Sequence, residues 1–316
     1  MATPDASRKN AKRAMSFVTT ITPFNEDGGF DEVGIHKHMA RMAEAGLGVY
    51  VGTGGSGEGY SLSQHETKRL LEIAVEEVGG HAPVRAMGVE PRSASQMIDF
   101  LKLARDAGIE VSQLYSLDIG HGHAPTPAEL DTYYHTVLQA ITDLPLVIST
   151  HQSVGYKIPA GQIEGYVRDF PNLVGINCSH QDVGYLMQII DGCGKMVDVY
   201  CGGPVQGLQT LAYGGNGFLA SEGNLSPHLA VRVIDKFLEG DQAGFLDAYN
   251  RLARLSQGLY GNGGIRVTKA ILNNLGLPGG YPRLPKLIAD EGEIERAMTV
   301  VNAVNAGEYE DWGKGQ

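Results

Sequence analysis

The sequence has little cysteine. It holds three cysteines among 316 residues, Cys178, Cys193 and Cys201. An odd number with no zinc-finger spacing excludes a disulfide framework and a cysteine-based zinc motif. Free thiols of this kind favour a reducing compartment.

Long hydrophobic runs are also missing. No uninterrupted apolar run approaches the roughly 18 residues that a membrane helix needs. The first 14 residues are polar and basic, without the apolar stretch of a secretory signal. We therefore expect a cytoplasmic protein with no membrane partner.

Basic residues are in deficit, with 25 Lys and Arg against 36 Asp and Glu, a net charge of −11. No basic stripe with interleaved aromatic residues occurs, so we expect no nucleic-acid partner. The acidic balance bears on solubility rather than on function.

Eight short apolar runs are present, each rich in Val, Ile or Leu. Runs of about 4–6 such residues are typical of strands buried on both faces. They lie near residues 17–22, 48–52, 84–89, 111–115, 146–150, 173–177, 197–201 and 217–221.

Segments with apolar residues at helical spacing separate these runs, for example 64–78 and 93–107. Eight alternations of strand and helix predict an α/β fold, a (β/α)₈ TIM barrel. An open doubly wound sheet is the alternative. After residue 221 the pattern changes to four successive helices, 226–239, 241–259, 264–275 and 291–306. We therefore predict a barrel over residues 1–225 and a C-terminal helical extension over 226–316, packed on the barrel.

Several short motifs follow one another in order along the chain. They are Thr22-Pro23-Phe24 with Asp27-Gly28 and Asp31; Gly57-Glu58 with Leu62, Ser63 and Glu66; Gly217, Ser221 and Asn224-Leu225-Ser226-Pro227; and Val267, Lys269, Gly276-Leu277, Arg283 and Pro285. In these motifs the chain resembles the dihydrodipicolinate synthase / N-acetylneuraminate lyase family over nearly its whole length.

The resemblance implies a homotetramer, a dimer of dimers, that condenses or cleaves 2-oxo acids through a lysine imine. In that family the lysine ends strand six, in a GIKDSS-like run. Here the corresponding run is GINCSH, and Asn177 stands at the lysine position. An amide side chain has no nucleophilic amine, so we expect no imine, and no trapping by borohydride with pyruvate.

Two tyrosine positions differ as well. The proton-relay tyrosine of strand five falls at Ser149, or at Ile148 under another gap placement. On strand four, Tyr115 keeps one tyrosine of the usual pair, but the second is Ser116. Lys157 is the lysine nearest a strand end; the others fall on helices or tails, where we expect an ordinary pKa near about 10.4.

Four histidines follow three consecutive predicted strands: His121, His123, His151 and His180. With a carboxylate such as Asp118, Asp182 or Glu58 they would hold a divalent metal with an open position. Alternatively, His151 or His180 performs metal-free acid/base chemistry, or these histidines have no catalytic role. Because adjacent strands lie about 4.8 Å apart, we expect His151 and His180 to face each other.

The run Thr53-Gly54-Gly55-Ser56-Gly57 follows strand two, where the family holds the substrate carboxylate with hydroxyls and backbone amides. We expect Gly55 and Ser56, with Thr53 as the alternative hydroxyl, to bind substrate, and Glu58 at least to brace the loop. We also expect Ser221 and Asn224 to line the same cavity as Gly55, Ser56 and Asn177.

Three functions remain open. The first is a carbon–carbon or carbon–oxygen lyase that acts on a 2-oxo acid or related carbonyl compound without an imine and without a cofactor. The second is a catalytically silent homologue that binds a small carboxylate. The third is a metal-dependent aldolase or hydratase that uses the strand-end histidines. Asn177, Tyr115, Ser149, His151 and His180 are the candidate catalytic residues.

Overall fold

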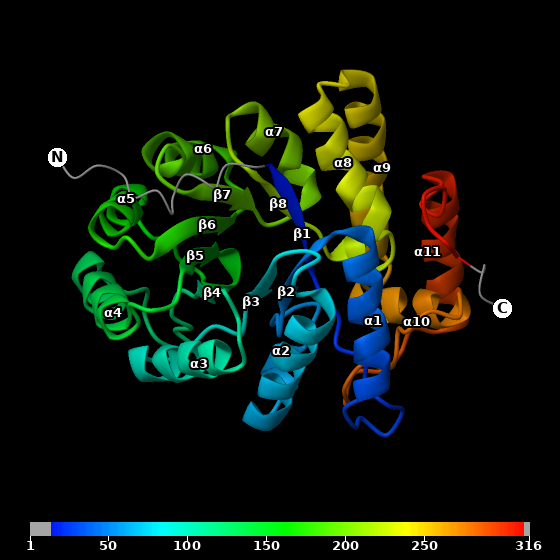
Figure 1. Ribbon diagram of the computed structural model, residues 1–316, viewed down its shortest axis with the longest axis horizontal. Coiled ribbons are helices and arrows are strands. Elements are labelled where there is room, and N and C mark those ends of the chain that lie inside the picture. The colour runs from blue at the N-terminus through cyan, green and yellow to red at the C-terminus, as the bar shows by residue number, and fades with distance from the viewer. Residues whose placement is uncertain (1–13, 313–316) are drawn as a thin grey trace. The chain divides into compact units, whose positions relative to one another are not determined.

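The computed structural model describes residues 14–312. Eight parallel strands close into a barrel in chain order, as the alternation of the sequence predicts (Figure 1). The TIM-barrel prediction is therefore confirmed, and the open doubly wound sheet is wrong. The strands are β1 (Met15–Thr19), β2 (Gly48–Val51), β3 (Val84–Ala86), β4 (Val111–Leu114), β5 (Leu146–His151), β6 (Leu173–Ser179), β7 (Asp198–Cys201) and β8 (Gly217–Leu219).

Helices follow the strands, and the four helices predicted after residue 221 are present. The helices are α1 (Glu32–Ala45), α2 (Gln64–Val78), α3 (Ala94–Asp106), α4 (Pro127–Ala140), α5 (Ala160–Asp169), α6 (Val183–Cys193), α7 (Gly207–Ala212), α8 (Pro227–Glu239), α9 (Gln242–Gly261), α10 (Ile265–Asn274) and α11 (Glu291–Ala303). Short 3₁₀ turns are η2 (Gly59–Ser61), η3 (Gln152–Val154), η4 (Pro204–Gln206) and η5 (Ser221–Asn224).

Burial explains the strand pattern, and glycine explains some of the boundaries. All four residues of β2 and of β7 are buried, as strands covered on both faces require. The predicted run 84–89 is strand only as far as Ala86. Gly88, two residues later, has a φ of 71°, a left-handed conformation that favours glycine and does not continue a strand.

The chain groups into two compact units. Among the described residues, one contains 14–15 and Val89–Leu219, and the other contains Ser16–Gly88 and 220–312. The predicted division at residue 225 falls inside the second unit and stays a prediction. In the first unit, Figure 1 shows α4, α5 and α6 lying outside strands β4 to β6.

In the second unit, the C-terminal helices share one hydrophobic core with residues that follow β1 and η5. Ile21 and Leu225 are fully buried in this core with Leu255 of α9, Ile271 of α10 and Val301 of α11. Burying a large aliphatic side chain stabilises a fold by about 1.5–3 kcal/mol. The C-terminal helices are therefore fixed to the segments that carry the strand-end loops of this unit.

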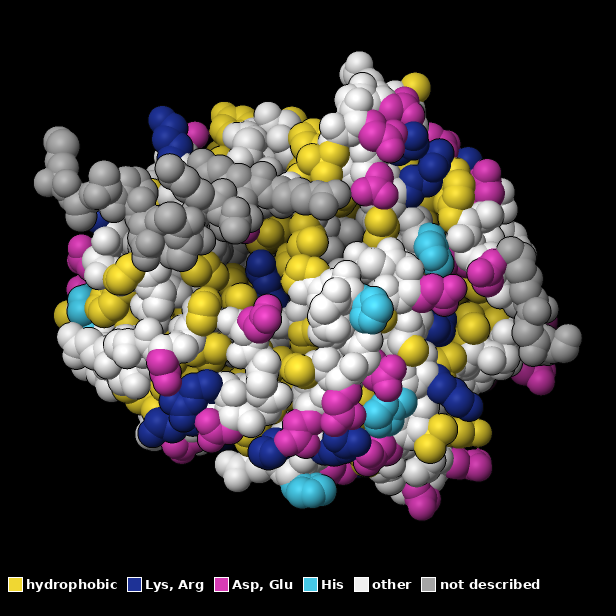
Figure 2. Space-filling model, viewed as in Figure 1, with side chains coloured by type: hydrophobic (Ala, Val, Ile, Leu, Met, Phe, Trp, Pro, Cys, Tyr) yellow, Lys and Arg dark blue, Asp and Glu magenta, His cyan; other side chains and the backbone are white. Residues whose placement is uncertain are grey.

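The surface is charged and mixed in sign. Figure 2 shows acidic and basic side chains interspersed over α1 and α2. There Arg69 pairs with Glu32 at 2.6 Å and with Glu76 at 2.9 Å. Exposed pairs of this kind contribute little to stability. Within residues 14–312, no helix is long and apolar enough to cross a membrane.

Candidate functional site

Asn177 occupies the strand-six position where the resemblance implies a lysine. It lies in β6, beside Ser149 of β5 and Tyr200 of β7, and is 1% exposed. Its Nδ2 donates a hydrogen bond of 2.5 Å to Oε1 of Gln113, from β4. Its Oδ1 has no hydrogen-bond partner in the described part of the chain. A neutral, buried amide pair therefore replaces an ionisable amine.

No phenol stands at the strand-five position, where Ser149 is 2% exposed. The Ser149 carbonyl accepts a hydrogen bond of 2.8 Å from the Ser116 hydroxyl. Tyr115 is buried, and its carbonyl accepts a hydrogen bond of 2.7 Å from the Tyr133 hydroxyl of α4. Burial raises the pKa of Tyr133 well above its ordinary value, so this phenol stays protonated.

His180 lies directly after β6 and is 8% exposed. Its ring meets that of Tyr185 edge-on, with the centroids 5.4 Å apart. Burial lowers the pKa of His180, and the positive charge of Lys157 lowers it further. Its ring bonds to the backbone of Tyr156, whereas Nε2 is buried without a hydrogen-bond partner among residues 14–312. At neutral pH this is an uncharged imidazole with a free nitrogen, which can accept a proton.

His151 is the last residue of β5, and its side chain is 41% exposed. Nδ1 of His151 lies 2.5 Å from the Ser153 hydroxyl, which donates a hydrogen bond of 2.8 Å to Glu90. Burial lowers the pKa of His151, and the charge of Glu90 raises it in part. The chain Glu90–Ser153–His151 fixes the orientation of the imidazole.

The two histidines are electrostatically coupled, because charge on His151 lowers the pKa of His180. Lys157 is paired with Asp182 at 2.5 Å, and its side chain is 44% exposed. That His151 and His180 face each other stays a prediction.

His121 and His123 are exposed on the loop after β4. Asp118 of the same loop pairs with Arg92 at 3.3 Å, and Glu58 pairs with Lys269. Over residues 14–312, no three His, Cys, Asp or Glu side chains gather in an arrangement that could hold a metal ion. The donors expected from the sequence therefore do not assemble into the three-ligand set of a catalytic metal site.

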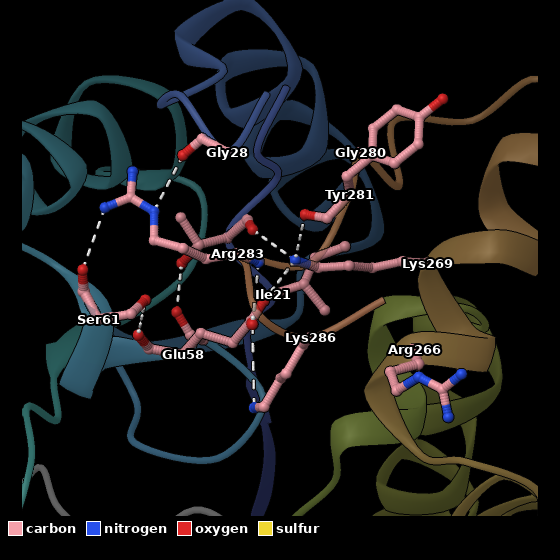
Figure 3. A network of polar contacts seen from close by, with 12 residues as sticks. Ile21, Gly28, Glu58, Ser61, Arg266, Lys269, Gly280, Tyr281, Arg283 and Lys286 are labelled. Carbon is pink, nitrogen blue, oxygen red and sulfur yellow. Dashed lines mark hydrogen bonds and ion pairs between the residues drawn. The ribbon is translucent and has the colours of Figure 1, made fainter. Parts of the chain in front are cut away.

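The loop after β2 is held by a buried ion pair (Figure 3). Nζ of Lys269, on α10, donates hydrogen bonds to Glu58 Oε2 at 2.6 Å, to the Thr22 carbonyl at 2.8 Å and to the Tyr281 carbonyl at 2.9 Å. These use all three hydrogens of the ammonium group. Lys269 is fully buried, and burial lowers its pKa to about 8. The expectation that every lysine other than Lys157 has an ordinary pKa is wrong for Lys269, yet this amine has no free lone pair.

Arg283 braces the same loop. Its guanidinium binds both oxygens of Glu66, at 2.6 and 3.0 Å, and its backbone N–H donates to Glu58 Oε1 at 3.2 Å. Figure 3 shows it reaching the carbonyls of Gly28 and Ser61 as well. Glu58 has a φ of 52°, which is uncommon for a residue other than glycine. The anchors at both of its oxygens hold this conformation in place.

The predicted binding residues of the second compact unit separate into two sets, those that line a pocket and those that stabilise loops. Gly55, Ser56 and Ser221 line one pocket of about 140 Å³. Thr53 is 2% exposed, and its hydroxyl accepts a hydrogen bond of 2.8 Å from the Gly57 N–H inside the loop. Asn224 is fully buried and accepts from the Ile21 N–H at 2.9 Å. Glu58, Thr53 and Asn224 thus stabilise the loops and do not line the pocket. That the pocket is shared with Asn177 stays a prediction.

Sequence reasoning did not predict the roles of four residues. Gln113 and Ser153 contact side chains 64 and 63 positions away, which no local pattern indicates. Lys269 belongs to a motif of the sequence, but its contact with Glu58, 211 positions away, cannot be read from that motif. Glu222 does have a local signal in the sequence, because a carboxylate stands among small residues directly after an apolar strand. It is 1% exposed.

A sequence model of the dihydrodipicolinate synthetase family matches residues 12–304. The chain is 30% identical to the 4-hydroxy-tetrahydrodipicolinate synthase of Symbiobacterium thermophilum over 288 residues, 89% of this chain and 94% of the other. It is 27% identical to the enzyme of the same name from a strain of Thermus thermophilus over 258 residues, 81% of this chain and 84% of the other.

Solved structures share the fold. A prophage protein of the dihydrodipicolinic acid synthase family from E. coli K12, crystallised with pyruvate, superposes with a TM-score of 0.84 at 21% identity. The alignment covers 93% of this chain and 99% of that one. A dihydrodipicolinate synthase from Bacillus anthracis gives the same TM-score, identity and coverage.

Proposed function

This chain belongs to the dihydrodipicolinate synthetase family, and we propose that it is a lyase-type enzyme that acts on a 2-oxo acid or related carbonyl compound without a lysine imine. The observation that carries the proposal is the buried amide pair of Asn177 and Gln113 at the strand-six position. An imine requires a neutral amine with access to the substrate ketone. Asn177 supplies no amine, Lys269 donates all three of its hydrogens, and Lys157 is paired with Asp182.

His180 is the proposed base. Removing a proton from the carbon beside a ketone creates an enolate, the intermediate shared by aldol reactions and by dehydration of a 2-oxo acid. A neutral imidazole with an unpartnered Nε2 fits this task. His151 fits the role of a second acid or base, because Ser153 and Glu90 orient its ring.

The pocket residues Gly55, Ser56 and Ser221 are the proposed contacts to substrate oxygen atoms, since each lines one cavity and two carry hydroxyls. The proposed reaction relies on protein side chains alone, because the histidine and carboxylate donors do not gather into a metal-ligand set within residues 14–312. We also propose a cytoplasmic location, in keeping with the three free cysteines.

The first test asks whether an imine forms. The protein is incubated with pyruvate and borohydride, and the mass of the intact chain is measured. We expect no pyruvyl adduct. An adduct on any lysine would refute the absence of an imine.

The second test asks whether the enzyme makes an enolate. Pyruvate is incubated with the protein in D₂O, and loss of the methyl proton signal is followed by NMR. We expect exchange in the native protein and a loss of about 10²–10⁴-fold in His180→Gln, the usual contribution of a general base. His65→Gln, on the exposed surface of α2, is the matched control and should exchange at the native rate. Binding of pyruvate without exchange would favour the catalytically silent homologue.

A further inference from the structure

Glu222 is a carboxyl group buried without a counter-charge. It lies in η5 directly after β8 and is 1% exposed. No charged group in the described range acts on it, and its Oε2 has no hydrogen bond of normal geometry there. A carboxylate so enclosed and unpaired is costly, so such a group keeps its proton.

The neighbours of Glu222 supply no positive charge that would favour its carboxylate form. From α9, Ser256 approaches the carboxyl and favours its charged form, but less than burial opposes it, and Tyr260 is a neutral phenol. From α1, Arg41 donates to the backbone carbonyls of Asn224 and Leu225 rather than to the carboxyl. His38 is bonded to Asn224, and burial lowers its pKa to about 3, so it too is uncharged. Burial raises the pKa of Glu222 above its ordinary value.

The hydrogen bonds around Ser221 give the proton a path. The Ser221 hydroxyl lies 3.1 Å from Glu222 Oε1 and 3.1 Å from the Tyr260 hydroxyl. Ser221 has one hydroxyl hydrogen, so it can donate to only one of these neighbours at a time. If it donates outward to Tyr260, the contact to Glu222 is a hydrogen bond only when the carboxyl group donates.

The outer end of this chain opens into the pocket of about 140 Å³. The hydroxyl-bearing residues Ser56, Ser221, Tyr260 and Thr268 line it together with apolar Leu259 and Ile265. Among the described residues that line it, none is charged. A small neutral oxygen group, such as a ketone or hydroxyl, suits this lining.

We propose that Glu222 is a neutral carboxylic acid that supplies a proton, through the Ser221 hydroxyl, to a carbonyl oxygen of a small ligand in this pocket. The inference rests on the proposed lyase function and adds the acid to it. Glu222 acts through Ser221 and does not itself touch the ligand.

The proposed reaction converts a ketone into its enol. A base removes a proton from the carbon beside the ketone, and that C–H electron pair forms the C=C bond of an enol. The π electron pair of the C=O bond moves to oxygen, which takes the proton of the Ser221 hydroxyl. The Glu222 proton replaces the one that Ser221 lost, and Glu222 becomes a carboxylate until the reverse transfer.

The first experiment measures protonation in the ligand-free protein. Infrared spectra at pH 7 should contain the C=O stretch of a protonated carboxylic acid. We expect this band to disappear in Glu222→Gln and to persist in Glu26→Gln, a variant of an exposed loop residue. Absence of the band from the native protein would overturn the proposal.

The second experiment measures the pH profile of pyruvate proton exchange. The native rate should fall at high pH as Glu222 loses its proton. Glu222→Gln should be at least about tenfold slower and should lack this fall. Ser221→Ala should resemble Glu222→Gln, whereas Ser221→Thr, which keeps a hydroxyl, should recover most of the rate. A variant of Glu222 that keeps the native high-pH fall would overturn proton supply.

The two readouts also separate the two proposals. If the native protein exchanges no pyruvate protons at any pH, the proposed function fails for this probe. The infrared band then decides the state of Glu222 alone: its absence overturns the neutral acid, and its loss in Glu222→Gln supports it.

Discussion

Asn177 is the residue at which this barrel departs furthest from an imine-forming one. Its side chain is buried beside Gln113, and no cation among the described residues is bonded to either amide. A lysine placed there would lose its hydration beside the neutral Gln113 amide, so its pKa would fall and the neutral amine would become accessible.

We therefore predict that Asn177→Lys gains what the native chain lacks. Incubation with pyruvate and borohydride should add one pyruvyl group at residue 177, detected by mass spectrometry of peptides. Asn177→Gln, of similar polarity but without an amine, should add none. Turnover should stay low, because Ser149 supplies no phenol. A folded Asn177→Lys protein without an adduct would show that pyruvate does not reach this position.

A second residue-scale prediction concerns acid stability. Hydrogen bonds from Arg283 lower the pKa of Glu66 to about 2 from an ordinary value of 4.5. A depressed carboxyl pKa stabilises the folded state above pH 4.5, and this contribution is lost as the pH falls from 4.5 toward 2. Glu66→Gln should therefore lower the free energy of unfolding at pH 7, and the difference from the native protein should shrink below pH 4.5. A difference that is constant from pH 7 to 3 would contradict this assignment.

Positions of site residues could be predicted, but their surroundings could not. The strand-end locations of His151 and His180 follow from the apolar runs before them. That Nε2 of His180 lacks a partner within residues 14–312, and that Ser153 and Glu90 hold His151, depends on packing between segments up to 63 residues apart. Local pattern carries no record of such contacts.

Among the elements, α10 anchors the loop after β2 through Lys269 and Glu58. Breaking a buried ion pair on one side leaves an uncompensated charge, which costs about 3–5 kcal/mol. Lys269→Met should therefore lower the free energy of unfolding by about that amount in denaturant titrations.

The double variant Glu58→Gln with Lys269→Met separates the charge from the packing. With no carboxylate left behind, it should recover part of the loss seen in Lys269→Met. Equal destabilisation of the single and double variants would mean that the ion pair itself is not what holds the loop.

Element positions were largely predictable from periodicity and capping chemistry. Ser63 and Glu66 form a capping box at the start of α2, and Thr126 and Glu129 form another at α4. The predicted strand 17–22 differs, because β1 already ends at Thr19. Beyond Thr20 the backbone leaves the ladder, because the Ile21 N–H is satisfied by the Asn224 side chain instead of by a strand neighbour.

At the scale of the whole molecule, the (β/α)₈ barrel followed from counting alternations, since eight buried runs separated by helices have few other solutions. The division of the chain into two compact units could not be predicted from these alternations. Contacts between Ser16–Gly88 and the C-terminal helices depend on residues more than 200 positions apart, such as Thr22 and Lys269.

We propose that the protein assembles as a homotetramer, a dimer of dimers, as its family resemblance implies. Sedimentation velocity should give a species of four 33.8 kDa chains at micromolar concentration. A monomer across the accessible concentration range would contradict this assembly.

The pairing of Glu58 with Lys269 also has a consequence for how the chain is made. The two residues are separated by 211 positions. Ribosomes add about 5–20 residues per second, so Glu58 emerges on the order of 10–40 s before the ammonium group that donates a hydrogen bond to it. Throughout that interval the loop after β2 lacks this anchor for its carboxylate. A nascent chain halted before residue 269 should therefore expose this loop to proteases, whereas the released full-length chain should protect it.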